Sequence, residues 1–186
     1  MQNPEVAIDA RELAIGANEP EIHDLYAFWD TCRGGNTFPS QRDLDLIRIP
    51  ALLPSIFIVD LIGDDDYYYR YMGSNLDRYY GVSLTGMRAR EYRKSGRLIE
   101  VAVDFFHRIA RNAEMGILTT QLPSEAQDWL IYTRAALPVA DDHEIPNKII
   151  GIVLVKQAKQ ALHKLAGSLA TDRQEGGHAD TVFGKL

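Results

Sequence analysis

One segment, Ser55–Ile62, constrains the fold most strongly, because both faces of the strand that it predicts are apolar. Successive side chains of a strand point to opposite faces of a sheet. One face then carries Phe57, Val59 and Leu61, and the other carries Ile56, Ile58 and Asp60. A strand that is apolar on both faces has to be covered on both sides. The chain must therefore supply one layer of structure for each face of its sheet.

Four further segments predict strands. Gly63-Asp64-Asp65-Asp66 is typical of a turn, and the aromatic segment Tyr67–Met72 predicts the second strand of a hairpin. Three later strands are predicted at Gly116–Leu122, Trp129–Leu137 and Lys148–Lys156. Helical segments separate the first two strands from the last three instead of alternating with them. This order predicts an α+β fold with a five-stranded antiparallel sheet.

Two segments have the periodicity of amphipathic helices. The first, Pro20–Cys32, begins with a proline suited to a first helical turn, and its apolar side chains can cap one face of the sheet. These side chains are Ile22, Leu25, Tyr26 and Trp29. The second, Arg97–Asn112, has an apolar stripe that includes Phe105 and Ile109 and can cover the other face. Short helical turns are expected between Asn75 and Tyr92.

A length of 186 residues predicts one domain with flanking segments. We expect a flexible arm at 1–19 and a cap helix followed by an irregular, proline-punctuated segment at 20–54. The core of the domain is expected at 55–157, with helices on one face of the sheet. A short helical or flexible tail is expected at 158–186, with its helix at Ala158–Ala170.

The composition excludes several classes of protein. With 26 acidic and 20 basic side chains the net charge is -6, which does not favour binding to nucleic acid or to an anionic membrane. No apolar stretch is long enough to span a bilayer, and the N-terminus lacks the apolar region of a secretory signal. The single cysteine, Cys32, cannot form an intrachain disulfide. We expect a cytoplasmic protein that contacts neither membrane nor nucleic acid.

Several motifs together resemble a known family. An aromatic helix ends in Arg33-Gly34-Gly35, and Ile49-Pro50-Ala51-Leu52-Leu53-Pro54 leads into the first strand. Tyr69-Arg70-Tyr71-Met72-Gly73-Ser74-Asn75-Leu76 covers the end of the second strand and the residues after it. These motifs and the element order resemble a PAS domain, in particular an alphaproteobacterial single-domain PAS family. Leu46 departs from that family's pattern, which has proline there.

The resemblance implies the PAS fold and a sensory or protein-interaction role. PAS domains that bind haem usually use a histidine of the long helix, which here would be His107. Its position opposite the Phe105 stripe predicts a surface side chain and argues against haem. A flavin photosensor needs a cysteine after the second strand, and Cys32 precedes the first, so no flavin adduct is expected. We predict no cofactor.

A ligand pocket is predicted between the sheet and the long helix. Alternation puts Tyr67, Tyr69 and Tyr71 on one strand face, where they would offer apolar walls with hydroxyl tips. The alternative is a filled core whose hydroxyls bond to the backbone. The candidate pocket residues are Phe57, Val59, Tyr69, Tyr71, Phe105 and Ile109.

Charged clusters predict no metal site. Asp64-Asp65-Asp66 and Asp141-Asp142-His143-Glu144 are consecutive residues without calcium-loop spacing, so they are interpreted as solvated turns. The basic cluster from Arg88 to Arg97 could hold a phosphate or an acidic partner, although surface charge runs usually have no specific role. The other members of this cluster are Arg90, Arg93 and Lys94.

These observations predict a PAS module in signal transduction that is not an enzyme and acts on a signalling partner in trans. Homodimerisation is predicted through the cap helix, with Ile22, Leu25, Tyr26 and Trp29 as candidates. One alternative is a dimerisation scaffold that binds no ligand. Another is an isomerase-like enzyme on a curved sheet, which would require Asp60 to face a cavity with tyrosines.

Overall fold

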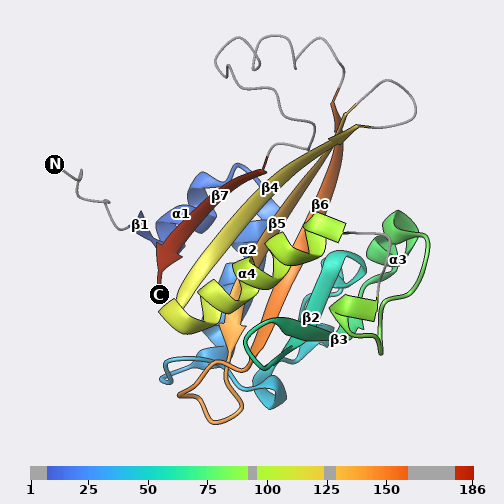
Figure 1. Cartoon of the computed structure of the whole chain (residues 1–186). Helices are drawn as coiled ribbons and strands as arrows, with labels where there is room; N and C mark the ends of the chain where they lie inside the picture. Colours follow the sequence, from blue (N-terminus) through green and yellow to red (C-terminus); the bar gives the residue numbers. More distant parts are fainter. Residues whose placement is uncertain (1–7, 92–95, 124–128, 159–178) are drawn as a thin grey trace, which may run out of the picture.

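The computed structural model describes residues 8–91, 96–123, 129–158 and 179–186. Its centre is one seven-stranded sheet with the strand order β1-β7-β4-β5-β6-β2-β3 (Figure 1). The strands are β1 (Ile8–Asp9), β2 (Ile56–Ile62), β3 (Asp66–Met72), β4 (Glu114–Pro123), β5 (Trp129–Val139), β6 (Lys148–Ala158) and β7 (Ala179–Lys185). The α+β class expected from the sequence is confirmed.

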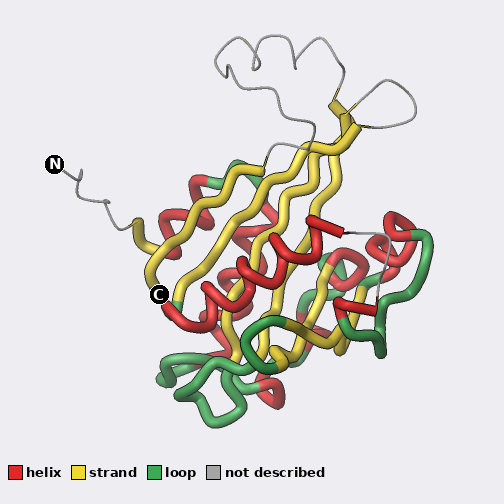
Figure 2. The backbone as a smooth tube through the Cα atoms, in the orientation of Figure 1, coloured by secondary structure: helices red, strands yellow, loops and turns green. Residues whose placement is uncertain are grey.

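Helices cover both faces of this sheet (Figure 2). On one face lie α1 (Ala10–Gly16) and α2 (Pro20–Arg33), and on the other lie α3 (Ser74–Tyr80) and α4 (Gly96–Asn112). Each layer has its own core, one around Trp29 and Ile58 and one around Phe57 and Phe105. Two cores are the physical consequence of a central strand that is apolar on both faces.

The sheet has seven strands, so the expected number of five was wrong. The two additional strands lie side by side at one edge, where β7 pairs antiparallel with β4 and β1 pairs parallel with β7. This parallel pair makes the sheet mixed. The two residues of β1 are too few to show an alternating pattern. β7 is held by its pairing with β4 and by Phe183, whose ring centroid lies 5.8 Å from that of Phe105. Both strands depend on contacts that are distant in sequence.

The ends of the chain also differ from the expectation of flexible segments. Within the expected arm, Asp9 caps α1 by accepting a hydrogen bond from the backbone N–H of Arg11 at 2.8 Å. Ala10 and Ala14 are buried, so the helix packs closely. In the expected tail, residues 179–185 form β7. The helix predicted at 158–170 falls, after its first residue, outside the described residues.

The helix α2 is the cap that the sequence predicted. Ile22, Leu25 and Trp29 are buried against the sheet. The indole Nε1–H of Trp29 donates a hydrogen bond of 2.7 Å to the carbonyl oxygen of Pro138 in β5. This bond satisfies the polar atom of a buried aromatic side chain and fixes the position of α2 on the sheet.

A bulge in the β2–β3 hairpin changes the predicted side-chain alternation. Val59 pairs with Tyr69 and Ile58 pairs with Tyr71, so Arg70 is an extra residue in β3. Tyr71 therefore packs with the α2 core, and its hydroxyl donates to the carbonyl oxygen of Leu53 at 3.2 Å. The prediction that Tyr71 shares a strand face with Tyr67 and Tyr69 was wrong, because an inserted residue moves every later side chain to the opposite face.

Candidate functional site

Two tyrosines from β3 form a hydrogen-bonded pair inside the α4 layer. The hydroxyls of Tyr67 and Tyr69 lie 2.9 Å apart, and the two rings meet edge to face with centroids 5.0 Å apart. Both side chains are buried. The pKa of each hydroxyl is raised, and the largest cause is burial, which removes water from the charged form. Both tyrosines are therefore neutral hydrogen-bonding groups at physiological pH.

Arg134 joins this layer from β5. Its strand neighbours Leu118 and Val153 belong to the α4 core, which places Arg134 on the same face. The Nη2 atom donates to the hydroxyl of Tyr80 at 3.4 Å, and the guanidinium carbon lies 5.6 Å from the ring centroid of Phe106. The side chain is half-buried.

The charge of Arg134 has no acidic partner in the part of the chain that the structure describes. Burial alone would lower the pKa of its guanidinium, but the tyrosine neighbours Tyr80, Tyr67 and Tyr69 raise it, and the net pKa lies above its ordinary value. Arginine is thus a cation here under all conditions in which the protein is folded. The site combines a fixed positive charge, neutral hydroxyls and aromatic rings.

One buried carboxylate oxygen lies on the same helix as Tyr80. Asp77 precedes Tyr80 by three residues in α3, which puts the two on neighbouring positions of the helix surface. Among the described residues, no group donates a hydrogen bond to the buried Oδ1 of Asp77.

The sequence predicted part of this layer and missed its charged group. Phe57, Val59, Tyr69, Phe105 and Ile109 all lie in the α4 core, as expected. The interior around the long helix is tightly filled, because a Cβ atom at Gly116 would lie 2.6 Å from the ring of Phe105 and 2.9 Å from Ile109. Phe105 and Ile109 thus pack closely against β4. Alternation along Trp129–Leu137 was the signal that could have placed Arg134 beside Tyr132 on this face.

The prediction that His107 lies on the surface was wrong. Only 5% of His107 is exposed, and its Nε2 lies 3.1 Å from the carbonyl oxygen of Asp66. The start of β3 covers this side of α4, which the helical periodicity alone could not show. Because a carbonyl only accepts hydrogen bonds, Nε2 must carry a proton. His107 thus holds the hairpin to the long helix.

Replacing His107 with phenylalanine is expected to lower the free energy of unfolding by about 1–3 kcal/mol, because the buried carbonyl of Asp66 loses its donor. His107→Gln retains an amide donor and should lose less. Urea unfolding of both variants measures the difference. Equal losses in the two variants, or a nitrogen NMR spectrum in which Nε2 is unprotonated, would contradict the proposed bond.

Asp60 lies on the opposite face of the sheet from the tyrosines, as its parity predicted. It forms an ion pair with Arg70, and Lys148 lies 3.9 Å away and pairs with Asp141. This arrangement is a charge network beside the α2 core. The isomerase-like alternative required Asp60 to face a cavity with tyrosines, and that placement is not observed.

The Asp141 carboxylate should contribute modestly to stability in a pH-dependent way. The hydrogen bond from Lys148 lowers the pKa of Asp141 below its ordinary value. A lowered folded-state pKa means that the stabilisation is present above the unfolded pKa of about 3.9 and is lost as the pH falls through the folded value. Asp141→Asn should cost under about 1 kcal/mol at pH 7, because half of this side chain is exposed.

The measurement is urea unfolding of the wild type and Asp141→Asn between pH 7 and pH 2.5. The two curves of stability against pH should converge in the acidic range. A constant difference over the whole range would show that the loss comes from packing and not from the ion pair.

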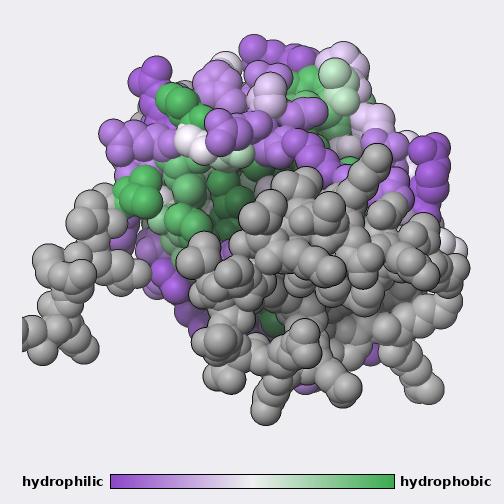
Figure 3. Space-filling model, turned by 90° about the horizontal axis from the view of Figure 1, so that it is seen from above, coloured by the Kyte–Doolittle hydropathy of each residue, from purple (hydrophilic) through white to green (hydrophobic). Residues whose placement is uncertain are grey.

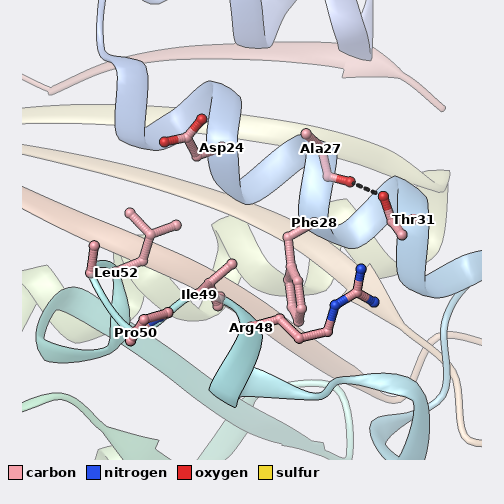
Figure 4. Close-up of a pocket in the computed structure, with 9 residues that line it drawn as sticks. Asp24, Ala27, Phe28, Thr31, Arg48, Ile49, Pro50 and Leu52 are labelled. Atoms are coloured by element: carbon pink, nitrogen blue, oxygen red, sulfur yellow. Dashed lines mark hydrogen bonds between the residues drawn. The ribbon is translucent and has the colours of Figure 1, made fainter.

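An open groove lies on the α2 side of the molecule (Figure 4). It has a volume of about 410 Å³ and runs between α2 and the segment that precedes β2. Phe28 lines its floor, and Arg48 and Asp24 bring opposite charges to its sides. Its lining residues are Asp24, Ala27, Phe28, Thr31, Arg48, Ile49, Pro50, Ala51 and Leu52. The sheet separates this groove from Arg134.

The acidic turns are structured by their own hydrogen bonds. The carboxylate of Asp142 accepts from the backbone N–H groups of Glu144 and Ile145, both at 2.9 Å. His143 Nδ1 lies 2.9 Å from the carbonyl oxygen of Phe38. Within the described residues, no three His, Cys, Asp or Glu side chains are grouped as ligands for a metal.

Only part of the basic cluster can be located. Arg90 forms an ion pair with Asp65, and the backbone N–H of Arg88 donates to Glu91. Arg93, Lys94 and the side chain of Arg97 lie outside what the structure describes. In the described residues no helix is both long and apolar enough to cross a membrane.

The fold defines a class of protein: a mixed α+β module in which a long helix and a short one cover one face of a sheet and a separate cap helix covers the other. Residues 17–154 match the family model of the PAS domain. The chain belongs to the PAS domain family. No curated protein matches the chain.

Solved structures resemble the chain at low sequence identity. The structure titled "VqmA bound to DPO" has 11% identity and a TM-score of 0.46 over 61% of this chain, and the match spans 57% of that protein. A light-oxygen-voltage domain studied with a flavin analogue has 13% identity and a TM-score of 0.44 over 67% of this chain and 94% of that one. A Vibrio cholerae VqmA dimer has 12% identity and a TM-score of 0.43 over 61% of this chain and 51% of that one.

Proposed function

We propose that this PAS domain is a sensory module of bacterial signal transduction that binds a small molecule between the sheet and the helices α3 and α4. It has no catalytic role in this proposal and signals by associating with a partner protein in trans. The motifs around Gly34, Pro50 and Gly73 support its assignment to the alphaproteobacterial single-domain PAS group, and a cytoplasmic location fits that role.

The observation that carries this proposal is the polar group in the α4 layer. A core that served only for packing would gain nothing from a half-buried arginine next to two bonded tyrosine hydroxyls, since burying charge without an acidic partner costs free energy. Arg134, Tyr80 and Tyr132 are each partly exposed, so a small molecule from solvent can reach them. Aromatic walls with a few polar groups are typical of small-molecule sites.

Homodimerisation also remains part of the proposal, but through a different surface from the one expected. Ile22, Leu25 and Trp29 are buried inside the monomer and are not available to a second copy. The edge formed by β1, α1 and β7 carries exposed large hydrophobic side chains instead, namely Ile8, Ile15, Val182 and Leu186. Figure 3 views the molecule from the upper end of the sheet and shows hydrophobic residues gathered in a recess between hydrophilic ones.

The proposed function is tested by native mass spectrometry and an absorbance spectrum of the protein purified without dialysis. An added mass, or an absorbance band beyond those of the aromatic side chains, supports a bound small molecule, and extraction under denaturing conditions then yields that molecule for identification. A dimer that carries no small molecule and binds none from a metabolite extract would favour the alternative of a scaffold. A monomer would contradict the dimer.

A further inference from the structure

Among the arginines that the structure describes, Arg134 combines partial burial with the lack of a neighbouring carboxylate. Five of these, Arg33, Arg70, Arg90, Arg108 and Arg111, lie within 4 Å of a carboxylate oxygen. Five other arginines have no such contact within the described residues, namely Arg11, Arg42, Arg48, Arg78 and Arg88, and all five are exposed. Arg134 is half-buried instead, donates to Tyr80 and lies beside Phe106. Water screens an unpaired charge well on the surface and poorly inside. Within the described residues, Arg134 is therefore the arginine that is partly shielded from water and has no counter-charge.

We propose that Arg134 binds the carboxylate or phosphate group of a small anionic ligand. This inference rests on the proposed ligand-binding function and specifies the chemistry of the ligand. A guanidinium has five N–H donors in a planar fork that matches two oxygens of an oxyanion. The hydrogen bond to Tyr80 uses one donor, and no other acceptor in the described residues takes the rest.

The side chains around Arg134 indicate the chemistry of the part of the ligand that carries the anionic group. The ring of Phe106 lies beside the guanidinium, and Tyr79 and Tyr132 form an edge-to-face pair with centroids 6.2 Å apart on the α3 side. Tyr132 lies two residues before Arg134 and therefore on the same face of β5. A flat apolar body next to the anionic group suits these rings.

Three probes of similar shape measure how much the negative charge of a ligand contributes to its affinity. Benzoate and phenyl phosphate carry the two kinds of oxyanion, and benzamide is an uncharged analogue of benzoate. We expect benzoate or phenyl phosphate to bind the wild-type protein in isothermal titration calorimetry and to shift the Arg134 Nε resonance. Benzamide should bind at least about 10-fold more weakly. The stronger of the two anions identifies the oxyanion class.

Arg134→Gln and Arg134→Lys test the role of the guanidinium. Arg134→Gln should weaken anion binding by about 10- to 100-fold, and Arg134→Lys, which keeps the charge but loses the fork, should fall between it and the wild type. Arg88→Gln removes an exposed arginine and should leave the affinity within about twofold. A binding arginine without a counter-ion is not a stabilising residue, so ligand-free Arg134→Gln should unfold at the same temperature as the wild type or higher.

The outcomes distinguish this inference from the proposed function. Equal binding of benzamide and benzoate, or full anion affinity in Arg134→Gln, would overturn the anionic ligand and leave ligand binding intact. A neutral molecule recovered from the purified protein would do the same. If no probe binds, an anionic molecule that copurifies with the wild type and is lost in Arg134→Gln still supports the inference. If no probe binds and no molecule copurifies with the protein, both proposals are overturned.

Discussion

Replacing Gly73 with alanine is expected to lower the free energy of unfolding by about 3 kcal/mol or more, at the upper end of the cost of overpacking. A Cβ atom at this position would lie 2.3 Å from the carbonyl oxygens of both Leu53 and Pro54. Neither oxygen can move without displacing the backbone that leads into β2. The N–H of Gly73 also donates to the carbonyl oxygen of Ile56 at 2.9 Å, so the strand end cannot easily shift away.

The measurement is urea unfolding followed by circular dichroism. Gly16→Ala provides a matched control, because a Cβ atom there meets nothing within 4 Å. A Gly73→Ala variant within about 1 kcal/mol of the wild type would mean that the two segments do not approach as closely as described. The expected loss of stability would also give a physical reason for two of the sequence motifs, because Gly73 and Pro54 belong to separate motifs that meet at this contact.

Removing the side chain of Trp29 should have an effect of similar size. Trp29→Ala is expected to cost about 3–5 kcal/mol, because it empties a buried site between α2 and the sheet. Only 1% of Trp29 is exposed, and its loss leaves the carbonyl oxygen of Pro138 without its donor. Trp29→Phe keeps most of the packing and should cost less, about 1–3 kcal/mol.

Thermal and urea unfolding, with hydrogen exchange of the α2 amides, measure this effect. Ile47→Ala is the control, because Ile47 is 84% exposed and its truncation should change the stability by less than about 0.5 kcal/mol. We expect a single cooperative transition at lower stability. If only α2 exchanged faster while the sheet kept its stability, the cap would be a separable element and not part of the folding unit.

The two predictions concern the two layers of structure that pack on opposite faces of β2. Gly73 fixes the join between the hairpin and α3 on one side, and Trp29 fixes α2 on the other. Of the four α2 side chains expected at a dimer contact, only Tyr26 stays partly exposed. An apolar stripe can be buried only once, and here the sheet of the same chain buries Ile22, Leu25 and Trp29.

Local patterns in the sequence determined most of the architecture. The helical spacing of Ile22, Leu25 and Trp29 predicted α2, the alternation around Val59 predicted β2, and the two apolar faces of that strand required two covering layers. These signals work because the periods of helix and strand depend on backbone geometry, which each segment carries by itself. The turn residues between Ile62 and Tyr67 likewise marked the hairpin.

Tertiary structure alone decided the features that depend on distant partners. One inserted residue, Arg70, moved Tyr71 to the opposite face, and the start of β3 buried His107, which its own helix would have left exposed. β1 and β7 exist because they pair with each other and with β4. The candidate site also depends on distant partners, because Arg134 contacts Tyr80 and Phe106 only when β5, α3 and α4 are assembled. The spacing of residues within one segment cannot predict these contacts.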